Sequence, residues 1–214
     1  MSRGVQRGRF KLSPNSNPRS KKKTRRPPRG FDVDVQDEAE LALHPTLTRM
    51  WMKRGHQRKI PAPGTNVKRQ ENAATDWRTG DLVRARSEHR DALTFCQVMD
   101  LGVARSARRK RRALVIVDNA PIHRPETSNA VKALLARHGK HLRLVYIPAY
   151  APDEEPQEKF WGTWRDHVTH NHQRRKITQL EKDSDHYFAW CVQHPHSVLE
   201  TIGSPYAKIQ NRKT

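Results

Sequence analysis

Five consecutive aliphatic residues, Ala113 to Val117, are the feature that most constrains the fold of this chain. Such a run predicts a strand buried on both faces, as at the centre of a parallel sheet. A helical stripe follows over 126–138, Gly139 marks its end, and a second strand is expected over 142–147. Strand, helix and strand in this order predict a right-handed crossover unit. The chain is therefore expected to be an α/β protein.

The rest of the chain supplies further strands and helices. Phe31, Val33 and Val35 alternate with polar residues, which is the period of a half-buried strand. The segment 67–75 is a weaker strand prediction, because Lys68 to Asn72 has little β propensity. The remaining predicted elements are a strand over 81–86 after a turn at 78–80, a helix within 88–104, a helix that begins near Pro156, and a helix over 177–193.

Charge and composition narrow the partners of the chain. The formal charge is +20, the apolar fraction is 34%, and the mean hydropathy is −0.98. This charge predicts attraction to polyanions, nucleic acid first, although an unrelated basic protein stays open. The two cysteines form no CxxC pair, and no apolar run is long enough to span a membrane. We expect no membrane partner and a cytoplasmic protein, associated with the nucleoid when it is bound to DNA.

Three basic segments are candidates for DNA contact. Residues 1–30 hold eleven Lys and Arg and no acid, so they are expected to form a disordered basic arm. A folded domain is expected over 31–200, with a loose tail over 201–214. A solvated basic surface without a partner stays open for each segment. The predicted DNA-binding residues are Lys21, Lys22, Lys23, Arg25, Arg26, Arg108, Arg109, Lys110, Arg111, Arg112, Arg174, Arg175 and Lys176.

Three carboxylates are the candidates for chemistry. Asp37 continues the apolar face of its strand, where a buried charge is costly unless a cation meets it. Asp118 follows the aliphatic strand, at the strand end where open α/β sheets place ligands. Glu158 falls in the first turn of a helix, and its angle predicts a place at the rim of the core. Turn capping for Asp118 and a helix-dipole role for Glu158 are the plainer alternatives.

Together the three carboxylates predict a metal centre. Carboxylate oxygens are ligands that Mg²⁺ or Mn²⁺ prefers. Two such ions, about 4 Å apart, can activate a nucleophile and stabilise the leaving oxygen of a phosphodiester. We therefore expect Asp37, Asp118 and Glu158 to hold two ions. His123, five residues after Asp118, is an accessory candidate that either orients the loop by hydrogen bonding or approaches the phosphate.

Four blocks of the sequence resemble bacterial insertion-sequence transposases of the mariner superfamily. The resemblance covers about residues 31–175. The blocks are Phe31 to Pro45, Pro63 to Asn66, Val115 to Ala120 with His123, and Ile147 to Pro152 followed by Pro156, Gln157, Glu158 and Trp161.

The resemblance implies a fold and an activity. The fold would be RNase H-like, with a mixed five-stranded sheet flanked by helices. Asp37, Asp118 and Glu158 would be the DDE triad, with Asn119 and His123 as accessory residues. The implied reaction is hydrolysis at the transposon end, followed by transfer of the freed 3′-hydroxyl to target DNA. The implied partners are DNA and further copies of the chain.

The chain departs from the resembled family in three places. Glu155 stands where relatives usually have Asn, and Ala151 stands where they have Ser. The predicted strand at 68–72 is polar where relatives are hydrophobic, which predicts a weaker sheet. No helix-turn-helix module is visible before residue 31. A partner chain from an upstream reading frame, a truncated and inactive DNA-binding remnant, and a basic nucleic-acid-binding factor of another class therefore stay open.

Overall fold

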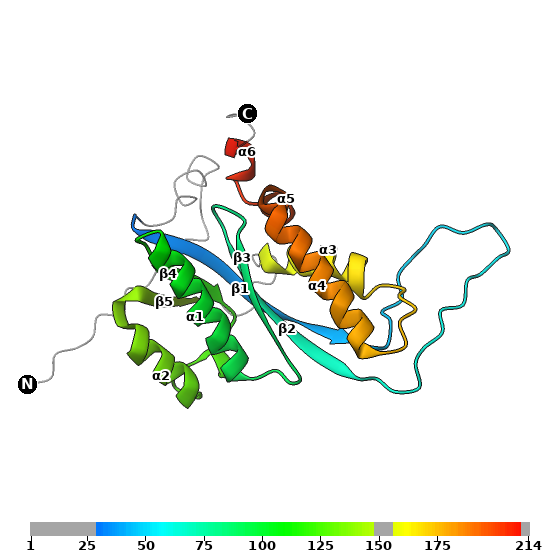
Figure 1. Ribbon diagram of the computed structural model, residues 1–214, viewed down its shortest axis with the longest axis horizontal. Helices are drawn as coiled ribbons and strands as arrows, with labels where there is room; N and C mark the ends of the chain where they lie inside the picture. The colour runs from blue at the N-terminus through cyan, green and yellow to red at the C-terminus, as the bar shows by residue number, and fades with distance from the viewer. Residues whose placement is uncertain (1–28, 148–155, 211–214) are drawn as a thin grey trace, which may run out of the picture.

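The computed structural model of the chain describes residues 29–147 and 156–210, and a five-stranded sheet is its centre (Figure 1). The strand order is β3-β2-β1-β4-β5. β1 pairs antiparallel with β2 and parallel with β4, so the sheet is mixed, as predicted. The strands are β1 (Phe31–Ala42), β2 (Lys68–Asp76), β3 (Leu82–Ser87), β4 (Arg112–Val117) and β5 (Leu142–Tyr146).

Helices cover both faces of the sheet and enclose two hydrophobic cores. One core lies between the sheet and α1 and α2, and the other lies between the sheet and α3, α4 and α5. Ala73 and Ala74 of β2 belong to different cores, because neighbouring side chains of a strand point to opposite faces. The helices are α1 (Ala92–Arg108), α2 (Asn129–His138), α3 (Pro156–Val168), α4 (Ile177–Gln193), α5 (Pro195–Thr201) and α6 (Ala207–Gln210).

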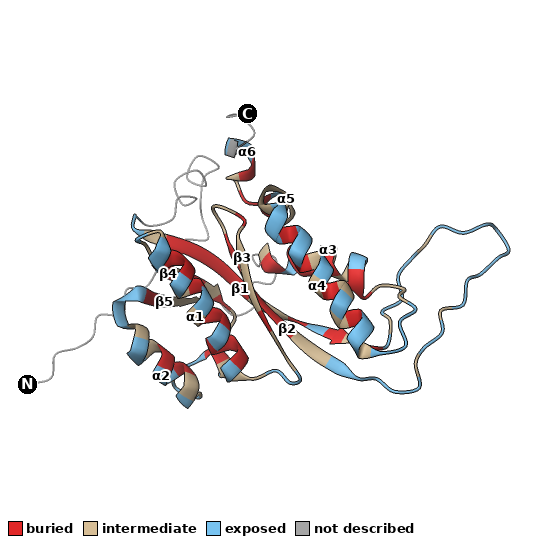
Figure 2. Cartoon of the chain, in the orientation of Figure 1, coloured by how far each residue is buried: buried red, intermediate tan, exposed pale blue. Residues whose placement is uncertain are grey.

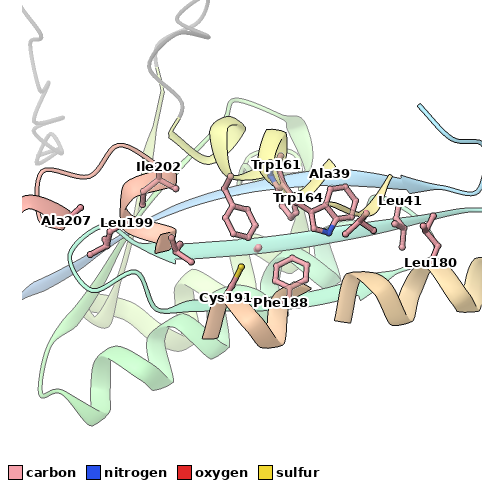
Figure 3. Close-up of a cluster of buried hydrophobic side chains, with 14 residues drawn as sticks. Ala39, Leu41, Trp161, Trp164, Leu180, Phe188, Cys191, Leu199, Ile202 and Ala207 are labelled. Carbon is pink, nitrogen blue, oxygen red and sulfur yellow. The ribbon is translucent and has the colours of Figure 1, made fainter. Parts of the chain in front are cut away.

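The apolar stripe of α3 is the centre of the second core (Figure 3). Gln157, Phe160, Trp161, Trp164 and Val168 are its buried residues, as the helical period predicts. Trp161 and Trp164 pack edge to face, with ring centroids 5.4 Å apart. They are therefore core residues and have no free face for stacking on a base.

β4, α2 and β5 form the expected crossover unit, with β4 and β5 parallel neighbours. Ser128 caps the start of α2, and Gly139 ends it with φ of +51°. Ala113, Val115 and Val117 are fully buried, whereas Leu114 and Ile116 are only partly buried. The expectation of a strand buried on both faces is therefore wrong for one face. The physical reason is that the helices on that side, α3 and α4, pack against β1 and leave this face of β4 partly uncovered.

The polar segment of β2 is a regular strand because its buried polar side chains have partners. Glu71 is fully buried and forms ion pairs with Arg84 at 3.3 Å and Arg86 at 2.7 Å. The hydroxyl of Ser184 on α4 donates a third bond to Glu71 at 2.7 Å. Tertiary contacts thus override the weak β propensity of this segment.

Arginines from the second basic run neutralise carboxylates at the start of β1 and at the neighbouring end of β2. Arg105 on α1 contacts Asp34, and Arg109 contacts Asp76 and Asp81. Burial raises the pKa of Asp34 to about 6, although Arg105 opposes that rise. Here these contacts are called the basal network; its members are Asp32, Asp34, Asp76, Asp81, Arg105, Arg109 and Arg111.

Residues 201–207 belong to the folded body, so the predicted loose tail does not begin at residue 201. Ile202, Ser204 and Ala207 are buried, and the Ser204 hydroxyl donates to the carbonyl of Trp77 at 2.5 Å. Residues 211–214 lie outside the described part. Gly80 packs so closely here that a Cβ would lie 2.0 Å from the Pro195 carbonyl oxygen. None of the described helices is both long and apolar enough to cross a membrane.

Candidate functional site

Asp37 and Asp118 lie on neighbouring parallel strands of the sheet. Val35 of β1 is the register partner of Ile116 of β4, and two further residues along each strand bring Asp37 level with Asp118. Neighbouring strands are about 4.8 Å apart, so the two Cα atoms are close. Asp118 comes directly after the last residue of β4. The sheet therefore brings together two of the three predicted carboxylates.

Three side chains, His123, Glu38 and Arg90, join Asp118 in a closed ring of hydrogen bonds, which we call the edge ring. Asp118 Oδ1 contacts His123 Nδ1 at 2.5 Å, and His123 Nε2 contacts Glu38 Oε1 at 2.8 Å. Arg90 closes the ring. It donates from Nε to Glu38 Oε2 at 2.8 Å and from Nη2 to Asp118 Oδ2 at 3.3 Å.

Glu38 and Arg90 are the members of the edge ring that the sequence analysis did not single out. The strand alternation places Glu38 opposite Asp37, as expected, but that face is covered by α1 and is not open to solvent. Its side chain is only 5% exposed. Gln36 and Asn72 also donate to its Oε1, at 3.0 and 2.9 Å. The sequence offered one signal for a partner of Glu38, which was the polar residue Asn72 in the segment predicted as another strand.

His123 is wholly buried between the two carboxylates of the edge ring. Its ring packs on Phe95 of α1, with centroids 4.4 Å apart. Burial lowers the pKa of this imidazole, but hydrogen bonds with Asp118 and Glu38 outweigh burial and raise the pKa to about 9. His123 is therefore protonated near neutral pH and carries a positive charge between two acids.

The same contacts keep Asp118 ionised. Burial raises the pKa of its carboxyl group, but His123, the Ala120 backbone N–H and Arg90 together lower it to about 2. The Asp118 side chain is 34% exposed, so it is the open member of an otherwise buried pair of acids. An ionised, partly exposed carboxylate suits a metal ligand or a cation contact.

Asn119 and Tyr146 hold the loop that carries His123. The Asn119 side-chain amide donates to the carbonyl of Ile147, and Arg124 donates to Asn119 Oδ1 at 2.6 Å. The Tyr146 hydroxyl donates to the carbonyl of His123 at 2.9 Å. Asn119 therefore ties the end of β4 to the end of β5.

Glu158 stands apart from these residues. It lies in the first turn of α3, as predicted, but its side chain is exposed and not at the rim of the core. Its neighbour Gln157 takes the core side of the helix and is fully buried. In residues 29–147 and 156–210, no three acidic, His or Cys side chains are gathered closely enough to hold a metal ion. The structure thus brings Asp37 and Asp118 together and leaves Glu158 on the adjacent helix.

The predicted DNA-binding residues divide into three groups. Lys21, Lys22, Lys23, Arg25 and Arg26 lie outside the described residues, as does the block around Ala151 and Glu155. The side chains of Arg108, Lys110, Arg112, Arg175 and Lys176 are exposed.

The third group is held in ion pairs within the protein. Arg109 contacts Asp76 at 2.6 Å, and Arg111 contacts Asp32 at 2.5 Å. Both carboxylates are almost completely buried, so these two arginines neutralise the interior of the protein. Arg174 forms a more exposed pair with Asp183 at 2.6 Å.

Comparisons with known proteins identify the family of the chain. Residues 32–181 match the family described as DDE superfamily endonuclease. The chain is 29% identical over 155 residues to a protein of Shigella sonnei named insertion element IS630 uncharacterized 39 kDa protein. That match covers 72% of this chain and 44% of the relative, so the chain spans less than half of the relative's length.

Solved structures share the fold at low sequence identity. A Mos1 transposase paired-end complex with left transposon end has a TM-score of 0.54 and 17% identity, covering 97% of this chain and 67% of that one. A pre-cleavage Mos1 transpososome has a TM-score of 0.55 and 18% identity, covering 89% of this chain and 58% of that one. These likenesses confirm the RNase H-like fold. The family match spans most of the chain, and the chain therefore belongs to the DDE superfamily endonucleases.

Proposed function

We propose that this chain is the catalytic part of an insertion-sequence transposase, which hydrolyses a DNA phosphodiester and transfers the freed strand to a target. The observation that carries the proposal is the pair Asp37 and Asp118, level on neighbouring strands, with Asp118 held in the edge ring. Membership of an endonuclease family and a relative named for an insertion element support it.

The donor atoms of the site fit divalent cations. Asp37 and Asp118 offer hard carboxylate oxygens at the same level of two neighbouring strands. Glu158 lies on α3, the helix that packs against β1. We propose that these three residues hold two Mg²⁺ or Mn²⁺ ions. Such ions, when bound, supply charge that activates a nucleophile and stabilises the leaving oxygen.

The edge ring positions Asp118. His123 and Arg90 each hold one carboxylate oxygen, so both oxygens of Asp118 have a defined direction. Glu38 holds His123 and Arg90 in turn. Because His123 is fully buried, we assign it a positioning role and no direct contact with the phosphate.

DNA is the substrate that this proposal implies. The net charge of +20 supports it, because cations that neutralise phosphates release counterions and strengthen binding. We further propose that the protein acts as a homo-oligomer on DNA, in the cytoplasm and with the nucleoid. A partner chain from an upstream reading frame stays a prediction.

Nicking of a supercoiled plasmid with Mn²⁺ tests the proposal. We expect Asp118→Asn to lower the nicking rate at least a hundredfold, because the site loses a charged ligand. Asp100→Asn is the matched control, because Asp100 also contacts a histidine at 2.5 Å and an arginine, away from the site. Equal activity of wild type and Asp118→Asn would contradict the proposal. DNA binding without nicking by the wild type would identify an inactive DNA-binding remnant.

A further inference from the structure

The segment from residue 43 to residue 67, which joins β1 to β2, is a basic surface that the site does not use; we call it the basic loop. It extends away from the body (Figure 1), and nearly all of it is exposed (Figure 2). The chain has no Asp or Glu between Glu40 and Glu71. The exposed cations of the basic loop are Arg49, Lys53, Arg54, Arg58 and Lys59.

These cations differ from the arginines of the basal network, because nothing in the described structure neutralises them. Within residues 29–147 and 156–210, none of the five forms an ion pair. Five like charges close together repel one another, so they do not stabilise the folded chain. A polyanion is the partner that their chemistry fits.

An exposed aromatic residue lies among the cations. The side chain of Trp51 is fully exposed at 104%, and those of Leu47 and Met52 are 72% and 44% exposed. The folded chain therefore buries none of the indole. Aromatic side chains interleaved with cations are typical of surfaces that bind nucleic acid, where a base or sugar packs on the ring.

The base of the basic loop is held firmly while its outer part extends. Leu43 and Val67 are joined by a backbone hydrogen bond of 2.9 Å. Asn171, beyond the end of α3, makes two bonds of 3.1 Å to the backbone of Thr48. This anchor also places the loop beside the segment that carries the exposed Arg175 and Lys176. The two basic segments are therefore neighbours.

The strand geometry relates the basic loop to the catalytic edge. From Asp37 to Leu43, β1 and the following residue advance six positions, or about 20 Å. This length corresponds to about six base pairs of duplex at roughly 3.4 Å each. A duplex that passes the edge ring along β1 thus reaches the loop within one helical turn.

We propose that the basic loop is a DNA-binding arm that grips the backbone about six or more base pairs from the cleaved phosphate, with Trp51 packed on the nucleic acid. The proposal rests on DNA being the substrate of the adjacent site. The proposed binding does not depend on base sequence, because cations that contact phosphates position a duplex but do not recognise its bases.

Salt-dependent binding to a 30-base-pair duplex in EDTA tests the proposal. We expect the triple variant Lys53→Gln, Arg58→Gln and Lys59→Gln to bind at least tenfold more weakly at low salt. Its slope of log affinity against log salt should shrink by about 0.9 for each lost phosphate contact. The charge-matched control is Lys132→Gln, Lys140→Gln and Arg143→Gln, three exposed cations of the α2 and β5 region. Equal losses in both variants, or none in either, would overturn the proposal.

Site-directed crosslinking supplies a second measurement that excludes a protein partner. The two native cysteines, Cys96 and Cys191, are buried, so a photoactivatable label attaches selectively at Arg54→Cys or, as control, Lys132→Cys. We expect the first to crosslink to DNA and the second not to. Crosslinking to a second copy of the chain, with no DNA adduct, contradicts the proposal.

The role of Trp51 is tested by its replacement. We expect Trp51→Ala to weaken binding to the 30-base-pair duplex, because the indole loses its contact with the nucleic acid. With single-stranded DNA, whose bases are free to stack, the expected loss is roughly fivefold to a hundredfold. Unchanged binding would overturn the part assigned to the indole. If the wild type nicks plasmid and the loop variants bind DNA as well as it does, only the DNA-binding arm is refuted. If the wild type neither binds nor nicks DNA, the proposed function is refuted as well.

Discussion

Two acidic clusters to which β1 contributes carboxylates differ in how far they are buried. The basal network, at the start of the strand, is closed by arginines whose own side chains are largely buried. The edge ring, further along, has one partly exposed carboxylate, Asp118, held by a buried histidine and a half-exposed arginine. The first cluster stabilises the fold, and the second keeps a charged group available to a ligand. The same pairing of acids and bases therefore serves structure or chemistry according to its burial.

The largest expected effect is on the basal network. Arg105→Ala removes the cation that faces the fully buried Asp34, and leaving a buried charge without its partner costs about 3–5 kcal/mol. We expect that loss in the free energy of unfolding, measured with urea at pH 7. Arg108→Ala, at an exposed site three residues away, is the control. A loss below 1 kcal/mol for Arg105→Ala would mean that the pair does not hold this end of the sheet.

A pH dependence follows from Asp34. Burial raises its pKa from 3.8 to about 6, so the folded state binds the proton more tightly than the unfolded state. This group therefore contributes stability that falls as the pH rises from about 4 to about 6 and is constant above. Two pKa units correspond to about 3 kcal/mol.

The variant Asp34→Asn isolates this dependence because it cannot titrate. We expect the stability of the wild type relative to the variant to be greater at pH 4 than at pH 7, as measured by urea unfolding at both values. A relative stability that grows with pH would show that Arg105 dominates and the pKa is not raised.

Smaller effects are expected at the edge ring, and on function more than on stability. His123→Gln breaks the buried link between Asp118 and Glu38, so we expect about a tenfold to hundredfold loss in nicking rate or Mn²⁺ affinity. His138→Gln is the matched control, since His138 also contacts an aspartate at 2.5 Å. Similar losses in both variants would contradict the positioning role proposed for His123.

The smallest effect on stability is expected at Arg90, whose side chain is 47% exposed. Arg90→Gln should change the free energy of unfolding by less than about 1 kcal/mol, as is usual for exposed ion pairs. It should also tighten Mn²⁺ binding, because a cation that contacts Asp118 is removed. Titration calorimetry measures this affinity, with Arg137→Gln as the control. Weaker binding in Arg90→Gln would mean that the ordering of Asp118 by the guanidinium outweighs its competition with the ion.

Much of the fold is predictable from local sequence. The buried stripe of α3 and the alternation in β1 follow from the periods of a helix and a strand, which depend on neighbouring residues alone. The parallel pairing of β4 with β5 follows from the strand, helix and strand order of that crossover unit, whereas the pairing of β1 with β4 is seen only in the tertiary structure. The segment 68–76 shows the limit, because its polar residues form a strand through partners on β3 and α4.

What the sequence by itself determined is the set of strands and helices and the strand-borne positions of Asp37 and Asp118. Only the tertiary structure decided which charges meet. It placed Glu38 beside His123, which is 85 residues away in sequence. It also bound Arg109 to buried carboxylates and left the cations of the basic loop without ion pairs. The physical reason is that strand and helix periods are local, whereas the partner of a charge is set by burial and by chain segments far apart in sequence.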